Sequence, residues 1–240
     1  LERQNIIAQF EREVRKMTEL SHPNLARVID FFVDGQNLYI IREFIPAYDI
    51  KTLMNKTSGP LREREVLSWG IQIADVLNYL YSKKFPAVFY RELNLTNILV
   101  NADGVVKLID MGLARVFQTE TNPEALKRLG SMEYASPEQF EEDGIFDQRS
   151  LVYNLGAMLF HMLTRQSPAQ NMFNIPEVEE YNPDVSPATA RIIKRATQYD
   201  HRLRYQSLSE MRRDLIKARK NPEVTLEFRS MVNEKKETPN

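Results

Sequence analysis

The sequence predicts an α+β protein whose later part is mainly helical. Two runs rich in β-branched and aromatic residues occur early, at residues 25–33 and 37–45. They are joined through Asp34-Gly35, a turn signal between two strands. The longest helical patterns, at residues 66–80 and 150–164, come later in the chain. Short strands and long amphipathic or apolar helices together define this class.

Composition bounds the classes of protein to consider. The chain has 240 residues, 42% of them hydrophobic, and a formal net charge of -1. It is long enough to bury a sizeable core, and its near-neutral charge gives no reason to invoke nucleic acid or an anionic membrane. No apolar run approaches the length of a membrane span, and we expect no signal peptide. The absence of cysteine excludes disulfides and thiolate metal sites and suits the cytoplasmic location that we expect. Because the sequence opens at Leu1 rather than Met, we expect a fragment.

The first helix is predicted from spacing. Ile7, Phe10, Val14 and Met17 are separated by three and four residues, as on one face of a helix. The helix should end near residues 21–23, because a residue that precedes proline avoids the α region.

Five further helices follow from the same reasoning. Residues 51–56 form a short helix before a break at residues 58–60. A long amphipathic helix has apolar or small residues at alternating gaps of four and three, namely Val66, Gly70, Ile73, Leu77 and Leu80. Residues 150–164 are apolar nearly all round, which places that helix inside a lobe. Ser186-Pro187 begins another helix, and residues 208–218 form the last one.

A hairpin is predicted between residues 98 and 109. Two short apolar runs flank a turn at residues 101–104 that contains Asp-Gly, a strong hairpin signal. Antiparallel pairing brings the ends of the ribbon together, and these ends carry Asn97 and Asp110. An amide oxygen beside a carboxylate is a plausible site for a hard cation such as Mg²⁺. From these residues alone, two polar strand caps without a metal remain the alternative.

The stretch from Phe89 to Gly112, FYRELNLTNILVNADGVVKLIDMG, resembles the catalytic core of protein kinases. The pattern is that of bacterial serine/threonine kinases, YRDLKPSNI…DGxVKLIDFG. The resemblance implies that Asn97 and Asp110 bind Mg²⁺ and that Arg91 belongs to the catalytic loop. The loop departs from the family at four positions: Glu92 replaces the Asp base, Asn94 the Lys, Leu95 the Pro and Met111 the Phe.

The resemblance also assigns roles in the earlier part of the chain. The stretch FEREVRKMTELSHPNL is similar to the family helix whose Glu pairs with a Lys on a preceding strand, and Glu13 is that Glu. The hinge, whose backbone binds adenine in the family, would be Glu43, Phe44 and Ile45. Leu99 would contribute to the same nucleotide pocket.

Arg42 precedes this hinge, where the family places an apolar residue. Arg42 could reach Glu13 or Asp110, stand in for the missing Lys and fill space that adenine needs. Alternatively, it extends outward into solvent. The sequence contains no G-x-G-x-x-G and no counterpart of the strand that carries the Lys. These elements either lie outside this sequence or never existed in the protein, and both alternatives stay open.

Two late motifs are markers of the family's fold. The stretch GSMEYASPE resembles GTxxYxAPE, and DHRLRYQS resembles DPxxRYxS, so Glu138 is expected to pair with Arg204. This pair favours protein kinases over small-molecule kinases of similar fold. Leu151 stands where the family has an Asp that anchors the catalytic loop. The loop that contains Thr119 and Thr121 is either a phosphorylation site or a plain surface loop, and we favour the latter.

The resemblance implies a protein kinase-like α+β fold with a truncated N-terminal lobe of one helix and two strands. We expect a partial N-terminal lobe and hinge at 1–45, a mainly helical C-terminal lobe at 46–220 and a charged, partly disordered tail at 221–240. We favour a pseudokinase that acts as a regulatory or binding module, because this explains the departures at Arg42, Glu92, Asn94, Met111 and Leu151 together. The alternative is an active serine/threonine kinase that uses ATP and Mg²⁺, with Glu92 as the base. The expected partner is a protein substrate or another kinase.

Overall fold

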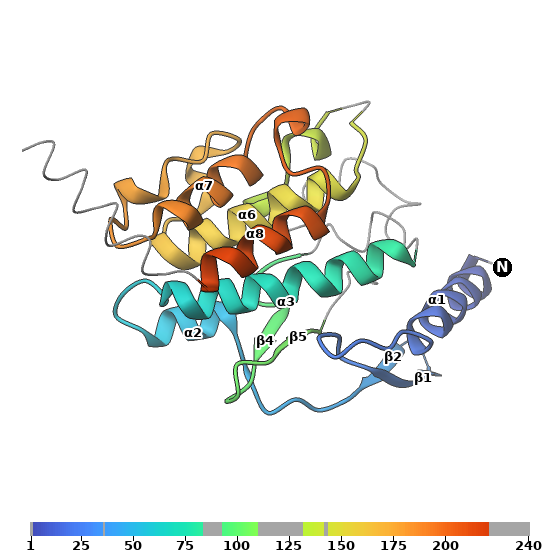
Figure 1. Ribbon diagram of the computed structural model, residues 1–240. Coiled ribbons are helices and arrows are strands. Elements are labelled where there is room, and N and C mark those ends of the chain that lie inside the picture. Colours follow the sequence, from blue (N-terminus) through green and yellow to red (C-terminus); the bar gives the residue numbers. More distant parts are fainter. Residues whose placement is uncertain (1, 36, 84–92, 110–131, 142–143, 221–240) are drawn as a thin grey trace, which may run out of the picture.

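The computed structural model describes residues 2–35, 37–83, 93–109, 132–141 and 144–220. Its architecture is a small part, built from helix α1 and the hairpin β1–β2, beside a larger helical lobe (Figure 1). The expected tail at 221–240 lies outside the described residues. The chain passes from the small part into the lobe through the segment between β2 and β3.

Helix α1 (Glu2–Thr18) packs on one face of the hairpin formed by β1 (Val28–Asp34) and β2 (Asn37–Arg42). Phe10, Val14 and Met17 are buried, which confirms the predicted helical face. The ring of Phe10 meets the ring of Phe31 edge to face, with centroids 6.0 Å apart. The buried stripe of α1 therefore holds this helix against the hairpin.

The opposite face of the same hairpin is exposed. It carries four large apolar side chains, each at least 40% exposed: Ile29, Phe32, Tyr39 and Ile41. The rings of Phe32 and Tyr39 stack on each other with centroids 4.8 Å apart. Within the described part of the chain, β1 is the one strand that pairs with β2. The small part is therefore a two-stranded sheet covered on one side.

A second sheet has the order β3–β4–β5 and contains the predicted hairpin. Strands β4 (Ile98–Val100) and β5 (Val106–Leu108) pair in antiparallel register, and Gly104 in their turn has a φ of 75°. That positive φ explains why glycine ends the turn. Strand β3 (Tyr48–Asp49), which sequence reasoning did not predict, pairs with β4. The segment after the hinge is thereby attached to the hairpin that carries Asn97.

The helical lobe is organised around α6 (Gln148–Thr164), which is buried at every position from Ser150 to Thr164. Helices α3 (Glu63–Ser82) and α7 (Pro187–Ala196) pack against it, and α8 (Leu208–Lys220) packs on α3. The short helix α2 (Ile50–Lys56) follows β3 directly. Five short 3-10 helices complete the described lobe: η2 (Met132–Tyr134), η3 (Pro137–Gln139), η4 (Pro168–Asn171), η5 (Val178–Glu180) and η6 (His201–Leu203).

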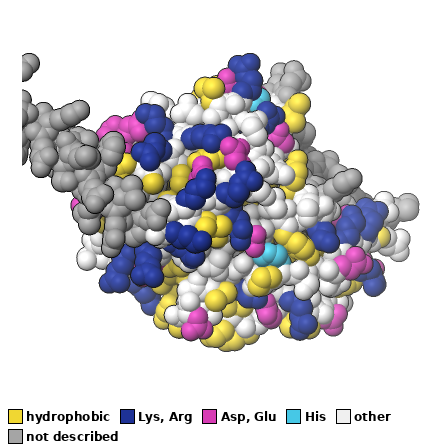
Figure 2. Space-filling view, in the orientation of Figure 1, with side chains coloured by type: hydrophobic (Ala, Val, Ile, Leu, Met, Phe, Trp, Pro, Cys, Tyr) yellow, Lys and Arg dark blue, Asp and Glu magenta, His cyan; other side chains and the backbone are white. Residues whose placement is uncertain are grey.

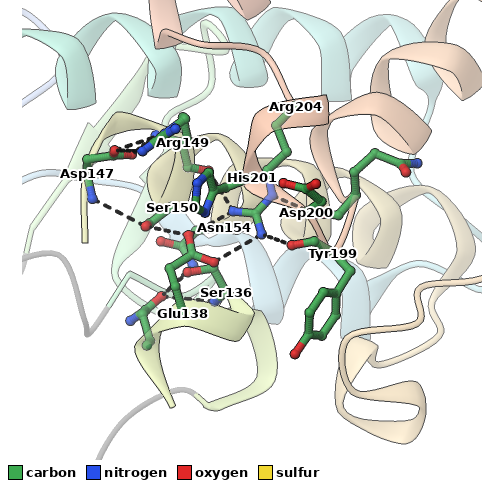
Figure 3. Close-up of polar contacts among 12 residues, drawn as sticks. Ser136, Glu138, Asp147, Arg149, Ser150, Asn154, Tyr199, Asp200, His201 and Arg204 are labelled. Atoms are coloured by element: carbon green, nitrogen blue, oxygen red, sulfur yellow. Dashed lines mark hydrogen bonds and ion pairs between the residues drawn. The ribbon is translucent and has the colours of Figure 1, made fainter. Parts of the chain in front are cut away.

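The predicted ion pair between Glu138 and Arg204 is present and buried (Figure 3). The guanidinium Nη1 and Nη2 donate to the two carboxylate oxygens of Glu138 at 2.8 and 3.0 Å. The remaining donors of Arg204 bond the backbone oxygens of Arg149, Gln198 and Tyr199, so all five N–H groups are used. Burial raises the pKa of Glu138, but the hydrogen bonds from Arg204 and Ser150 outweigh it and lower that pKa.

The face of the lobe in Figure 2 carries many Lys and Arg side chains over α3, α7 and α8. Several Lys and Arg side chains of the lobe pair with nearby carboxylates, among them Lys194 with Glu177 and Arg195 with Glu210. Such exposed pairs contribute little to stability.

No helix in the described part of the chain has the length and apolar character needed to cross a bilayer.

Close packing between α6 and α7 requires glycine at position 156. A Cβ atom there would lie 2.7 Å from the Cβ of Ala196 and 2.9 Å from the Cγ2 of Thr197. We expect Gly156→Ala to lower the free energy of unfolding by about 1–3 kcal/mol, because the helices must separate. Urea unfolding measures this change. Gly59→Ala is the matched control, since nothing lies within 4 Å of its added Cβ. Equal stability of the two variants would contradict the packing argument.

Removal of the buried guanidinium should be far more costly than removal of an exposed one. Arg204→Met leaves Glu138 charged and buried, so we expect a loss of about 3–5 kcal/mol in unfolding free energy. Arg202→Met breaks an exposed pair with Asp200 in the same motif and should not measurably change the unfolding midpoint. If both variants unfold at the same denaturant concentration, the Glu138–Arg204 pair does not stabilise the lobe.

Candidate functional site

The loop before β4 is organised by the side chain of Asn94. Its Oδ1 accepts hydrogen bonds from the backbone N–H groups of Thr96 at 2.8 Å and Asn97 at 3.1 Å. Leu93 and Leu95 on either side are buried and anchor the loop in the core. Asparagine favours such turns because its side chain can imitate a backbone acceptor. The position at which the family resemblance implied a lysine is thus used to hold the loop itself.

Asn97 lies at the end of the hairpin, as predicted. The backbone N–H of Ile109 donates to the carbonyl oxygen of Asn97 at 3.0 Å, directly beyond the Ile98–Leu108 pair. Asp110 follows Ile109 in the chain but lies outside the described residues. The hairpin therefore brings Asn97 next to the residue that precedes Asp110. The amide oxygen of Asn97 is of the kind that Mg²⁺ takes as a ligand. In the described part of the chain, no three histidine or acidic side chains gather into a metal site.

Arg42, at the end of β2, points toward the β4–β5 hairpin. Its Nη1 donates to the carbonyl oxygen of Ile109. Glu13 is buried on α1 and accepts from Lys16 of the same helix at 2.9 Å, with Arg12 at 3.6 Å. The anticipated ion pair between Arg42 and Glu13 is not formed, because Glu13 bonds to its own helix instead. The anticipated contact of Arg42 with Asp110 falls outside the described residues.

The hinge segment is fixed mainly through Glu43. Its carboxylate accepts from Lys107 Nζ at 2.8 Å and from the backbone N–H of Arg27 at 3.1 Å. The Lys107 ammonium, which hydrogen-bonds this carboxylate, lowers the pKa of Glu43. The backbone N–H of Glu43 donates to the carbonyl oxygen of Arg27 at 3.0 Å, so it is already bonded within the chain.

The other expected pocket residues differ in exposure. Phe44 is 89% exposed, whereas Ile45 and Leu99 are half-buried. Leu151, which stands in place of the family's loop-anchoring Asp, is fully buried in α6. Arg91, Glu92, Met111, Thr119 and Thr121 lie outside the described residues.

A groove of about 770 Å³ lies beside the hinge and was not anticipated from the sequence. Its lining includes Phe44, Tyr48 and Trp69 together with the turn of the β4–β5 hairpin. Phe44 and Ile45 of the expected hinge line this groove, whereas Arg42 and Asn97 do not. No local pattern predicts it, because three elements distant in sequence form its walls.

Comparison with protein families gives a match to the protein kinase domain over residues 2–231. A probable serine/threonine-protein kinase PknB from Lactococcus lactis is 31% identical over 220 residues, which cover 87% of this chain and 34% of that protein. The serine/threonine-protein kinase PrkC of Bacillus subtilis is 28% identical, with 87% of this chain and 33% of that protein covered. This chain therefore spans about a third of the length of these relatives.

Solved structures give the same fold. The kinase domain of PknI from Mycobacterium tuberculosis superposes with a TM-score of 0.69 over 89% of this chain and 78% of that chain, at 19% sequence identity. At this identity the likeness concerns the fold alone.

The role of Asn94 in holding the loop is testable. Asn94→Ala removes the acceptor of two backbone N–H groups, so we expect a loss of about 0.5–2 kcal/mol in unfolding free energy. Asn94→Asp keeps an acceptor oxygen and should restore most of this loss. Asn55→Ala, on the exposed surface of α2, is the matched control. A urea unfolding series in which Asn94→Ala and Asn55→Ala coincide would contradict the assigned role.

Proposed function

The chain belongs to the protein kinase family, and from that premise we propose that it is a pseudokinase, a regulatory or binding module with little or no phosphate transfer. The observation that carries the proposal is the hydrogen bond from Arg42 to the carbonyl oxygen of Ile109. It supports a nucleotide site that is closed by the protein's own side chain. A guanidinium group at the back of the pocket fills space that an adenine ring needs.

The residues of the catalytic loop also favour a pseudokinase. Phosphoryl transfer depends mainly on positioning and on electrostatic stabilisation of the transferring phosphate. Asn94 carries no charge, and its oxygen is bonded to the loop backbone. Glu92 keeps a carboxylate but adds a methylene relative to the family's Asp, and a misplacement of about 1 Å can cost about a hundredfold in rate. These losses multiply, because they act on the same transition state.

An active serine/threonine kinase is the second candidate. One observation favours it. The backbone N–H of Ile109 donates to the backbone carbonyl oxygen of Asn97, which keeps the residue that precedes Asp110 beside Asn97. The side chains of Asn97 and Asp110 would hold Mg²⁺ there, and the ion would neutralise charge on the nucleotide phosphates. Glu92 would then orient the hydroxyl of a serine or threonine in a protein substrate.

A thermal unfolding titration with ATP, with and without Mg²⁺, separates the two candidates. We expect no stabilisation of the wild-type chain. In Arg42→Met the pocket is opened, and nucleotide at about ten times its Kd should add about 1.4 kcal/mol of stability. Arg27→Met, which removes an exposed arginine nearby, is the control and should behave like the wild type.

Three outcomes would count against the proposal. A Mg²⁺-dependent stabilisation of the wild-type chain means that the site is open. Failure of Arg42→Met to gain nucleotide binding means that Arg42 is not what closes it. Phosphate transfer to a protein, abolished by Asp110→Asn, would establish the active kinase instead.

A further inference from the structure

A cavity of about 630 Å³ lies where α3 begins and α8 ends, two helices that run side by side in the lobe (Figure 1). The buried part of its lining is apolar and comprises Leu67 and Ala218, which are 2% and 7% exposed. The exposed part is cationic and comprises Arg64, Arg219 and Lys220. Ligand pockets commonly have volumes of about 300–1,000 Å³ and combine an apolar lining with a few convergent polar groups. This α3–α8 cavity therefore has the size and the lining of a site for a small molecule.

The three cations of the cavity are not paired with a carboxylate in the part of the chain that the structure describes. The guanidinium Nη1 of Arg219 donates to a neutral group, the hydroxyl of Ser68, at 3.4 Å. By contrast, the ammonium of Lys217 on the same helix lies 2.9 Å from the carboxylate of Asp214. The positive charge of the cavity is therefore not neutralised by these neighbouring side chains.

One acidic side chain, that of Glu63, also lines the cavity. Its carboxylate accepts hydrogen bonds from the backbone N–H of Ser186, at 3.1 Å, and from the hydroxyl of the same residue. Ser186 is the N-cap of α7, so these two bonds hold the carboxylate of Glu63 at the start of that helix. The carboxylate forms no ion pair with the three cations, and the lining keeps an excess of two positive charges, three less one.

Helix stability does not account for the arginine at position 64. Arg64 lies in the first turn of α3, next to the start of the helix at Glu63. The first turn lies at the positive end of the helix dipole and favours acidic side chains, so an arginine there is unfavourable. Leu67 and Ser68 follow three and four residues later, on the same face of the helix, and they line the same cavity. An arginine at an unfavourable place on a cavity-lining face is expected where an anion binds.

We propose that the α3–α8 cavity binds a small organic molecule that carries a phosphate group. The phosphate is held by Arg64, Arg219 and Lys220, and the organic part lies against the apolar lining. A guanidinium can donate two parallel hydrogen bonds to phosphate oxygens. A phosphate monoester carries a charge of about −1.5 to −2 near pH 7, which matches the positive excess of the lining better than the single charge of a carboxylate. The inference does not rest on the proposed function, because neither Arg42 nor Asn97 lines this cavity.

Isothermal titration calorimetry with three probes, at equal and low ionic strength, tests the class of ligand. The probes are 1-naphthyl phosphate, 1-naphthoate and inorganic phosphate. We expect naphthyl phosphate to bind about tenfold more tightly than inorganic phosphate, because its ring contacts the apolar lining and the aliphatic stems of the cationic side chains. Naphthoate should bind about tenfold more weakly than naphthyl phosphate, because it has less charge and fewer acceptor oxygens.

Variants of the cationic side chains test the location of the site. Arg64→Gln and Arg219→Gln should each weaken binding of naphthyl phosphate about tenfold, as for the loss of one charge-assisted hydrogen bond. Lys217→Gln is the matched control, because it removes a positive charge from α8 that does not line the cavity, and it should bind as the wild type does. All three side chains are exposed, and thermal unfolding of each variant establishes that it is folded.

The proposal is overturned if naphthyl phosphate does not bind, if folded Arg64→Gln and Arg219→Gln keep the wild-type affinity, or if Lys217→Gln loses as much affinity as they do. Naphthoate that binds as tightly as naphthyl phosphate overturns the assignment of a phosphate group. Inorganic phosphate that binds as tightly overturns the assignment of an organic part. Because no ATP is present and Arg42 is unchanged, each of these failures is distinct from a failure of the pseudokinase proposal.

Discussion

The lobe that carries the site depends on the buried ion pair between Glu138 and Arg204. The pair joins η3, at the end of the segment before α6, to the turn that leads into α8. Each polar atom of the guanidinium is bonded, so burial of this charge is compensated by geometry rather than by solvent. Ser150 of α6 donates to the same carboxylate at 2.6 Å, which ties the central helix into the arrangement. The contacts that stabilise the framework around the catalytic loop are therefore made by residues outside the expected catalytic site.

The family's fold and the family's chemistry depend on different residues in this chain. Apolar burial on α6 and the Glu138–Arg204 pair retain the family pattern. The departures lie at Arg42, Glu92 and Asn94, positions where the family's reaction requires a particular size or charge. A retained fold thus gives no measure of activity, because the site is a small set of side chains on a scaffold that does not need them.

Much of the fold could be predicted from local pattern. The apolar run from Ser150 to Thr164 predicted a helix inside the lobe, and every one of its residues is buried. Asp103-Gly104 predicted the hairpin turn, which Gly104 makes with a positive φ. Strand β3 could not be predicted, because its two residues, Tyr48 and Asp49, become a strand only by pairing with β4. Pairing between distant segments leaves no periodicity in so short a stretch.

The candidate site was less predictable than the fold, because side-chain direction depends on partners. From the sequence, Arg42 could point inward to a partner or outward into solvent. In the structure its guanidinium donates to the carbonyl oxygen of Ile109, which is distant in sequence. The contact between Lys51 and His161 likewise joins two helices that no local pattern relates. Long flexible side chains are placed by such encounters, whereas buried apolar faces are already specified by spacing.

Three described groups near the expected nucleotide pocket are already bonded within the chain. Arg42 bonds to Ile109, Glu43 accepts from Lys107 and Arg27, and the oxygen of Asn94 accepts from its own loop. A ligand that used these groups would first have to displace an internal hydrogen bond, and the exchange would bring little net gain. Under the proposed function, these internal hydrogen bonds are the reason why the site would be closed toward a nucleotide.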